Sequence, residues 1–284
     1  MRDLLAIVRA AAKAGGLAAA RLREEEGVEE VGRGSGGDVA LKGDLIAEET
    51  IIETLKREVE SFKLVSEEAG EKNYGQCELY FIVDPLDGSR NYKRGLPFFA
   101  TSVAAAKGPS LKDVLAGAIY APMLGLEFYA GKGKGAYLNG RKVRMAQDSE
   151  MVVAVNTTPK AYFLPHMLTL ALSIKGVVIR ALGAASLEIA GVATGWLSAY
   201  IDPWFAVRVV DVAAALLLAA EAGAYVSVKG SLTNPPSLSL RERLHVLVAN
   251  SEHVAELLKE IAVNALGFPP EKLVHGSFLN ENGC

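Results

Sequence analysis

The sequence has little cysteine, no long apolar run and no excess of basic residues. Cys77 and Cys284 are the only cysteines among 284 residues, so neither a disulfide framework nor a cysteine-based zinc site can be built, and a reducing, cytoplasmic setting is expected. The apolar run at 212–220 is too short to span a bilayer. Charged residues interrupt the apolar positions of residues 1–23, which is typical of an amphipathic helix and not of a secretion signal. No contact with a membrane is therefore expected.

The charges of the chain nearly cancel. Thirty Lys and Arg residues stand against 33 Asp and Glu residues, which gives a formal net charge of -3. Nucleic acid requires a concentrated positive surface, so it is not expected as a main partner. Half of the residues are hydrophobic (50%), which is typical of a soluble globular protein with a core large enough for two domains or one large α/β unit. The four histidines show no metal-ligand spacing.

The hydrophobic pattern predicts a layered α/β protein. The clearest helical and strand-like segments of the first half lie at 2–23, 45–60, 79–83, 98–106, 114–120 and 126–130. The pair Asn139-Gly140 between two short strands is a strong hairpin signal. Beyond about residue 148, short apolar runs alternate with helical segments, a pattern typical of α/β layering.

Two carboxylates three positions apart carry the clearest chemical signal. Asp84 and Asp87 follow the apolar strand predicted at 79–83, at a place where α/β folds commonly bind ligands. Asp, Pro, Gly and Ser are also the ordinary residues of turns, so a simple turn is the alternative. Glu67 follows another apolar stretch at 62–65. Three acids therefore emerge near the ends of predicted strands.

Two more acids lie at the starts of predicted helices. Asp44 precedes the helix at 45–60, and Asp211 opens a nearly apolar helix near 211–222; helix N-capping is the alternative role for each. Mg²⁺ prefers several oxygen ligands, which acids at the ends of separate elements can supply. Composition and spacing thus predict a carboxylate metal site and leave its reaction open.

The segment Asp84–Ser89 resembles the D-P-[IL]-D-G-[TS] signature of the inositol monophosphatase family, whose members are magnesium-dependent, lithium-sensitive sugar phosphatases. The resemblance covers roughly residues 1–262 in unbroken order. The further motifs that carry it are Glu67-Glu68, Leu96–Phe99, Gly131–Gly140 and Val210–Ala214. Residues 202–208, which contain an arginine, resemble the longer version found in archaeal members that act on both inositol phosphates and fructose 1,6-bisphosphate.

This resemblance implies the layered αβαβα sugar-phosphatase fold of the α/β class. An N-terminal α+β domain, residues 1–146, would carry most of the metal ligands, and a C-terminal α/β domain, residues 147–284, would carry Asp211 and the substrate contacts. Family members are typically dimeric, so a homodimer is expected.

The resemblance also assigns metal ligands and catalytic residues. Glu67, Asp84 and the Leu86 carbonyl would hold one Mg²⁺, and Asp84, Asp87 and Asp211 would hold a second; a third, weaker ion is expected near Glu67 and Asp44. The residues expected to take part in catalysis, by orienting and deprotonating the nucleophilic water, are Asp44, Ser89 and Glu67.

Substrate contacts are expected from both predicted domains. The candidate residues are Asp87, Gly88, Ser89, Arg180, Gly183, Ala184, Ala185, Asp202 and Arg208. The backbone N–H groups among them would bind phosphate oxygens, and Asp202 would bind sugar hydroxyls. Arg180 or Arg208 would receive a second phosphate, with a simple surface charge as the alternative for each.

The expected reaction is hydrolysis of small phosphate monoesters, with myo-inositol 1-phosphate and fructose 1,6-bisphosphate as the predicted substrates. A phosphatase of 3'-phosphoadenosine 5'-phosphate or of NADP is the alternative within the same chemistry. The alternative of another class is a non-catalytic regulator that uses this fold to bind protein or RNA partners, because a fold alone does not fix a function.

Overall fold

The computed structural model describes residues 3–24, 26–37, 39–76, 78–145, 150–158 and 161–267. Within them the strands form a two-stranded, an eight-stranded and a five-stranded sheet. The elements of the first half are α1 (Leu4–Arg23), β1 (Glu30–Arg33), β2 (Val39–Leu41), α2 (Lys42–Glu58), β3 (Phe62–Ser66), β4 (Gly70–Tyr74), β5 (Tyr80–Asp87), α3 (Ser89–Arg94), β6 (Ala100–Ala106), the 3-10 helix η1 (Leu111–Asp113), β7 (Val114–Ala121), β8 (Leu126–Gly131), β9 (Gly135–Leu138) and β10 (Arg141–Lys142).

The second half continues with shorter strands and longer helices. Its elements are β11 (Val152–Val155), α4 (Leu164–Ile174), β12 (Val178–Arg180), α5 (Ala185–Thr194), β13 (Ala199–Arg208), α6 (Val209–Ala222), β14 (Tyr225–Gly230), β15 (Arg243–Ala249) and α7 (Glu252–Leu266).

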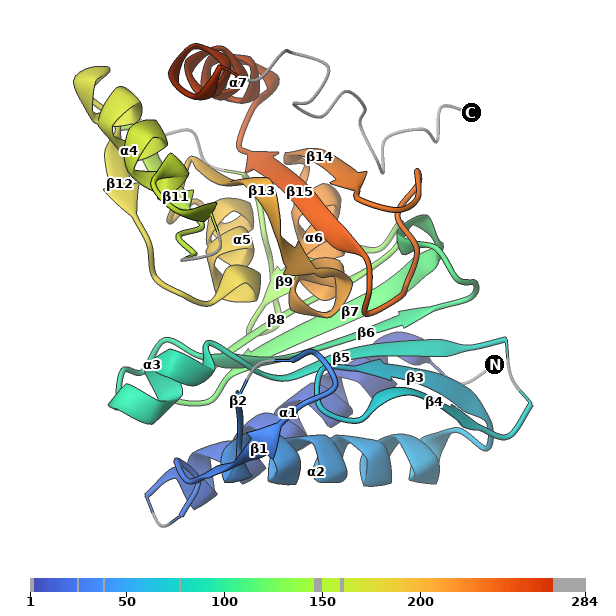
Figure 1. The fold of residues 1–284 in the computed structure, drawn as a ribbon. Coiled ribbons are helices and arrows are strands. Elements are labelled where there is room, and N and C mark those ends of the chain that lie inside the picture. Colours follow the sequence, from blue (N-terminus) through green and yellow to red (C-terminus); the bar gives the residue numbers. More distant parts are fainter. Residues whose placement is uncertain are drawn as a thin grey trace.

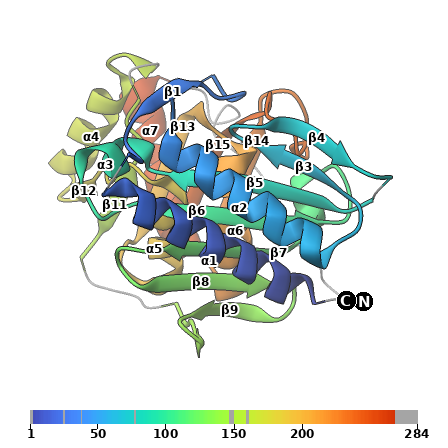
Figure 2. The same cartoon turned by 90° about the horizontal axis from the view of Figure 1, so that it is seen from below.

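The elements stack in five layers, helix, sheet, helix, sheet and helix (Figure 1). Figure 2 shows α1 and α2 lying side by side across the outer face of the eight-stranded sheet. α5 and α6 lie between the two large sheets, while α4 and α7 lie beyond the five-stranded sheet. The predicted layered αβαβα fold is therefore confirmed.

The strand order of the larger sheet brings two acids together. The order is β10-β9-β8-β7-β6-β5-β3-β4, and β3 and β5 are parallel, with Ser66 paired to Val83. Because parallel strands end at the same edge of a sheet, Glu67 and Asp84 emerge next to each other. The smaller sheet has the order β12-β11-β13-β15-β14. Its central strand β13 leads directly into α6.

α6 is apolar on nearly all sides because it lies between the two sheets. Its residues Val209–Ala219 are all buried, and Asp211 is the one charged residue among them. A helix buried on every side needs no polar face. A carboxylate in such a helix requires hydrogen-bond donors or a cation, because burying an unpaired charge is costly.

The predicted helices over 2–23 and 45–60 are confirmed as α1 and α2. The predicted hairpin is confirmed as well: Asn139 and Gly140 join β9 to β10 with φ values of 47° and 81°. The strand predicted at 79–83 is too short, because β5 extends to Asp87. Both acids thus lie inside the strand, with a shift in pairing register between them.

The predicted boundary between residues 146 and 147 lies outside the described residues, so the division into 1–146 and 147–284 stays a prediction. Among the helices that the structure describes, none combines the length and the apolar character needed to cross a bilayer.

Candidate metal centre and active site

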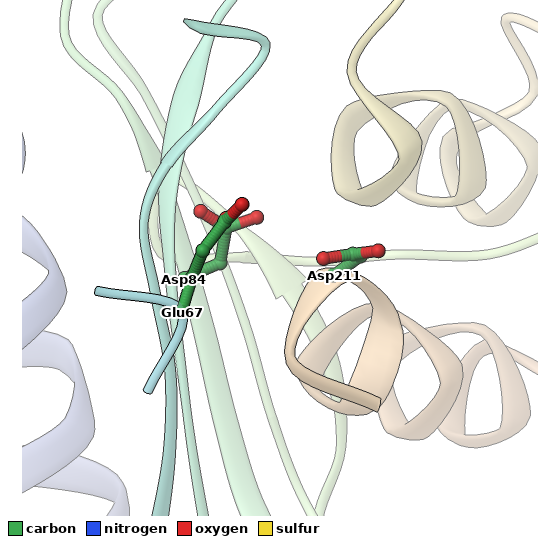
Figure 3. A group of neighbouring side chains, drawn as sticks. All are labelled: Glu67, Asp84 and Asp211. Carbon is green, nitrogen blue, oxygen red and sulfur yellow. The ribbon is translucent and has the colours of Figure 1, made fainter. Parts of the chain in front are cut away.

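Three carboxylates from separate elements converge at one point. Glu67 follows β3, Asp84 lies in β5, and Asp211 lies in the first turn of α6. One ligand atom from each lies within 4.8 Å of the other two. Figure 3 shows Glu67 and Asp84 entering this space from the strand side and Asp211 from the helix side. The structure thus brings together three of the predicted metal ligands.

The chemistry of this cluster suits a hard divalent cation. Asp84 is buried, with 2% of its surface exposed, and its Oδ1 accepts a hydrogen bond from the Leu86 N–H at 3.0 Å. Burial raises the pKa of Asp84 well above its ordinary value, and the charges of Glu67, Asp87 and Asp211 raise it further. An all-oxygen set of crowded, buried carboxylates is stabilised by positive charge, and Mg²⁺ prefers oxygen ligands.

Arg208 supplies positive charge to the cluster. Its Nη2 lies 2.6 Å from Glu67 Oε1, and its Nε lies 3.2 Å from Asp211 Oδ1. The Arg208 backbone N–H also donates to Asp211 Oδ2 at 2.7 Å. The predicted substrate ligand Arg208 is therefore placed among the predicted metal ligands instead of at the surface.

Asp87 joins the two large sheets. One carboxylate oxygen accepts the N–H of Ala185 at 3.1 Å, and the other accepts the N–H of Ser186 at 2.7 Å and the Ser186 hydroxyl. Burial raises the pKa of Asp87 to about 7; the Ser186 hydroxyl opposes this, and the charge of Asp211 adds to it. Both oxygens of this predicted metal ligand thus bind the first turn of α5, and its metal role stays a prediction.

Asp44 and Asp211 occupy equivalent positions in their helices. Each is the third residue of its helix, α2 or α6, and accepts the backbone N–H of the residue before that helix; for Asp44 this is Leu41 at 2.6 Å. Neither is the N-cap itself. Burial raises the pKa of Asp44 to about 7, the Leu41 N–H opposes this rise, and Glu67 and Glu48 add to it.

The predicted phosphate-binding segments meet in the structure. A Cβ added to Gly88 would lie 3.1 Å from the Ala184 Cβ and 3.3 Å from the Gly183 carbonyl oxygen. The Asn91 side chain links the two segments by donating to the carbonyls of Phe98 and Leu182, each at 2.7 Å. Ser89 is the first residue of α3.

Two other predicted substrate residues have different surroundings. Asp202 is fully buried, and its oxygens accept the Asn156 side-chain amide and the N–H groups of Trp204, Ala206 and Val207. These bonds shape the irregular part of β13, so contact with a sugar would require this turn to open. Arg180 is exposed at the end of β12 and donates to its neighbour's carbonyl.

The glycine-lysine hairpin does not offer its N–H groups to a phosphate. The N–H groups of Gly133 and Gly135 each donate to the carboxylate of Glu221, at 2.7 Å in both cases. The segment also has no Ser or Thr after Gly-Lys, which a P-loop requires. The segment is thus a hairpin held by the end of α6.

Two acids beside the centre had no role predicted from the sequence, although Glu68 was named there as part of the Glu67-Glu68 motif. Glu48 is buried and accepts the Ser66 hydroxyl and the Ala69 N–H. Glu68 lies next to Glu67, and burial, followed by the charges of Asp44, Glu67 and Glu48, raises its pKa to about 8. Glu48 could have been found from its spacing, because it lies one helical turn after Asp44 on the same face of α2.

Comparison with known proteins agrees with this geometry. The model of the inositol monophosphatase family matches residues 1–265. A fructose-1,6-bisphosphatase/inositol-1-monophosphatase of Thermococcus kodakarensis is 37% identical over 234 residues, which are 82% of this chain and 86% of that protein. The Nus factor SuhB of Escherichia coli is 33% identical over 231 residues, or 78% of this chain and 82% of that protein.

Solved structures share the fold over most of their length. A structure of an inositol monophosphatase-fructose 1,6 bisphosphatase has a TM-score of 0.75 and 28% identity, and the match covers 90% of this chain and 98% of that one. The extragenic suppressor protein suhB of Bartonella henselae has a TM-score of 0.76 and 26% identity, with 90% and 97% covered. The chain therefore belongs to the inositol monophosphatase family and is a phosphoric monoester hydrolase.

Proposed function

We propose that the protein is a Mg²⁺-dependent phosphatase of small phosphorylated sugars and polyols, acting on myo-inositol 1-phosphate and fructose 1,6-bisphosphate. The observation that carries this proposal is the convergence of Glu67, Asp84 and Asp211 within 4.8 Å. The relative from Thermococcus kodakarensis, whose name gives both activities, supports this choice of substrates.

The proposed metal ligands are the three converging acids together with Asp87 and the Leu86 carbonyl. They would hold two Mg²⁺ ions, with a third near Asp44. Such ions, when bound, lower the pKa of a water molecule and offset the charge of the phosphate. The chain's own part is to hold the acids in place through hydrogen bonds such as that from the Leu86 N–H to Asp84.

The proposed general base is Asp44, supported by the Ser89 hydroxyl and assisted by Glu67. Asp44 accepts a proton as the water oxygen forms its bond to phosphorus and the ester oxygen leaves with the electron pair of the broken bond. The carboxylate is held in place because Leu41 donates to one of its oxygens.

The proposed phosphate cradle is formed by the N–H groups of Gly88 and Ser89, beside residues 183–185, in which the Ala185 N–H already donates to Asp87. Backbone N–H groups at helix starts attract anions. Arg180 would bind the second phosphate of a bisphosphate, or Arg208 would do so after leaving Glu67 and Asp211. Asp202 would reach a sugar hydroxyl after its turn opens.

The test is phosphate release by the purified full chain on a substrate panel at fixed Mg²⁺. We expect activity on the two named substrates, loss of activity in EDTA and loss in Asp87→Asn. Asp113→Asn is the control, since Asp113 accepts the Ser110 N–H at η1, away from the acids. Release that persists in EDTA or in Asp87→Asn would contradict the proposal. Higher kcat/KM for 3'-phosphoadenosine 5'-phosphate or NADP would favour the nucleotide alternative.

A second candidate is a regulator that binds protein or RNA, which the relatives named Nus factor SuhB favour. It predicts a stable partner in pull-downs together with inactivity on the whole panel. The presence of all four predicted acidic ligands, Glu67, Asp84, Asp87 and Asp211, favours catalysis.

We further propose a homodimer in a cytoplasmic setting. α4 and the turn before it carry exposed apolar side chains, with 65% of Phe163, 63% of Leu170 and 75% of Ile174 accessible. Apolar residues that gather on a surface favour contact with a second chain. Light scattering coupled to size exclusion tests this, and a monomer at micromolar concentration would contradict it.

A further inference from the structure

One cation is built into the acidic centre. Arg208 is the last residue of β13 and directly precedes α6, so its guanidinium lies beside the first turn that carries Asp211. The Nη2 atom lies 2.6 Å from Glu67 Oε1 and 3.2 Å from Asp211 Oδ1. The three side chains are 10%, 14% and 12% exposed respectively, so water screens these contacts only weakly.

The surroundings keep this arginine charged and in place. Burial alone would lower the pKa of Arg208, but the carboxylates of Asp211, Glu67 and Asp84 raise it above its ordinary value. Charge-assisted hydrogen bonds between a guanidinium and carboxylates are strong where solvent is excluded. The guanidinium thus offsets part of the charge of the same acids that a metal would bind.

The loop between β1 and β2 packs over the guanidinium. The N–H of Gly36 donates to the Glu67 carbonyl at 2.8 Å, and that of Ser35 to the Glu68 carbonyl at 3.1 Å. A Cβ on Gly36 would lie 2.2 Å from Arg208 Nη1, so the backbone at Gly36 lies directly against the guanidinium. Arg208 is therefore enclosed between the acids and this loop.

We infer that Arg208 is an internal competitor of the metal: its guanidinium binds both Glu67 and Asp211, and a Mg²⁺ ion bound by either acid must displace it from that acid. The inference rests on the proposed function. Mg²⁺ would bind its ligand oxygens at about 2.1 Å. Its double positive charge would then repel the guanidinium that binds the same oxygens. Arg208 lowers the affinity for Mg²⁺ and holds the acids together until the metal binds.

A purely structural role for Arg208 makes a different prediction. If Arg208 only stabilised the acids in positions suited to the metal, its removal would weaken Mg²⁺ binding. Competition predicts the reverse, stronger Mg²⁺ binding together with a less stable metal-free protein. The sign of the change in Mg²⁺ affinity therefore separates the two roles.

The test is isothermal titration of MgCl₂ into the full chain after removal of metal. We expect Arg208→Gln to bind Mg²⁺ at least about tenfold more tightly than the wild type does. A change of this size is typical of the coupling between two ligands. Its Tm without metal should fall, and Mg²⁺ should raise that Tm by more than it does in the wild type. Arg9→Gln is the control, because Arg9 pairs with Glu127 at 2.7 and 3.1 Å between α1 and β8 and should leave the Mg²⁺ affinity unchanged.

Arg208→Lys keeps the charge but loses the forked geometry, so it should exceed the wild-type Mg²⁺ affinity by a smaller factor. It replaces Arg208→Gln if that variant fails to fold without metal. Equal or weaker Mg²⁺ binding by a folded Arg208 variant contradicts the inference and leaves the proposed function intact. Absence of Mg²⁺ binding by the wild type would overturn both.

Discussion

Replacing Asp44 by Asn should stabilise the metal-free protein above neutral pH. Asp44 is 4% exposed, and its pKa is about 7 because burial and the nearby Glu67 and Glu48 disfavour the charged form. Asparagine carries no charge, and its side-chain oxygen can still accept the Leu41 N–H that Asp44 Oδ2 accepts at 2.6 Å. The substitution thus removes an electrostatic cost and keeps the hydrogen bond.

The size and pH range follow from the two pKa values. Well below the ordinary pKa of 3.8, the carboxyl is protonated in both the folded and the unfolded chain, so it does not change the free energy of unfolding. As the pH rises to 7, the unfolded chain loses this proton first, and the free energy of unfolding of the wild type falls. The difference between the folded pKa of about 7 and the ordinary pKa of 3.8 lowers the free energy of unfolding by about 4 kcal/mol at pH 8. About 2 kcal/mol of this loss is present at pH 5.

The assay is urea unfolding in EDTA, followed by circular dichroism at pH 5 and pH 8. Asp44→Asn should be more stable than the wild type at both values, with the larger gain at pH 8. The relief extends to Glu68, whose raised pKa depends partly on the charge of Asp44. Asp113→Asn, which loses charge at η1, should show no such gain. If Asp44→Asn is no more stable at pH 8, or gains equally at both pH values, the argument from burial is wrong.

Three further predictions concern other parts of the centre and its surroundings. Asp211→Asn should lower kcat by about a thousandfold, since a lost metal ligand removes several kcal/mol of transition-state stabilisation; a steady-state assay at saturating Mg²⁺ checks this, and a loss below tenfold would contradict it. Ser186→Ala removes a donor that lowers the pKa of Asp87, so the free energy of unfolding of the metal-free protein should fall more at pH 8 than at pH 5; urea unfolding in EDTA checks this, and an equal loss at both pH values would contradict it. Glu221→Ala should lower the free energy of unfolding by about 1–2 kcal/mol through the lost bonds to Gly133 and Gly135, with kcat/KM unchanged. Urea titration and the phosphatase assay together test this last expectation, and a large loss of activity would contradict it.

The acids were predictable because each stands next to a strong local signal. Glu67 and Asp84 follow or lie in apolar strands, and Asp44 and Asp211 lie at helix starts, all of which the hydrophobic pattern marks. The parallel pairing of β3 with β5 then brings the first two together. Local pattern was thus sufficient to mark these four acids, whose metal and catalytic roles stay predictions.

Contacts between distant segments were not predictable in the same way. The position of Arg208 depends on a partner 141 residues earlier in the chain, and no local pattern encodes that pairing. Asp202 resembled a substrate contact, but an irregularity inside β13 turns its oxygens to neighbouring N–H groups. The raised pKa of Glu68 depends on burial and on neighbouring acids that only the folded chain brings together.

The hydrogen bonds of Asp87 make the candidate centre depend on both halves of the chain. Asp87 belongs to the eight-stranded sheet, yet it holds the start of α5, which lies against the other sheet. A fragment ending at residue 145 would keep Glu67 and Asp84 but lose Asp211 and the donors that orient Asp87. Neither half could evolve as a separate catalytic module, and substitutions that tighten the packing between the sheets act on the same atoms as substitutions that tune the chemistry.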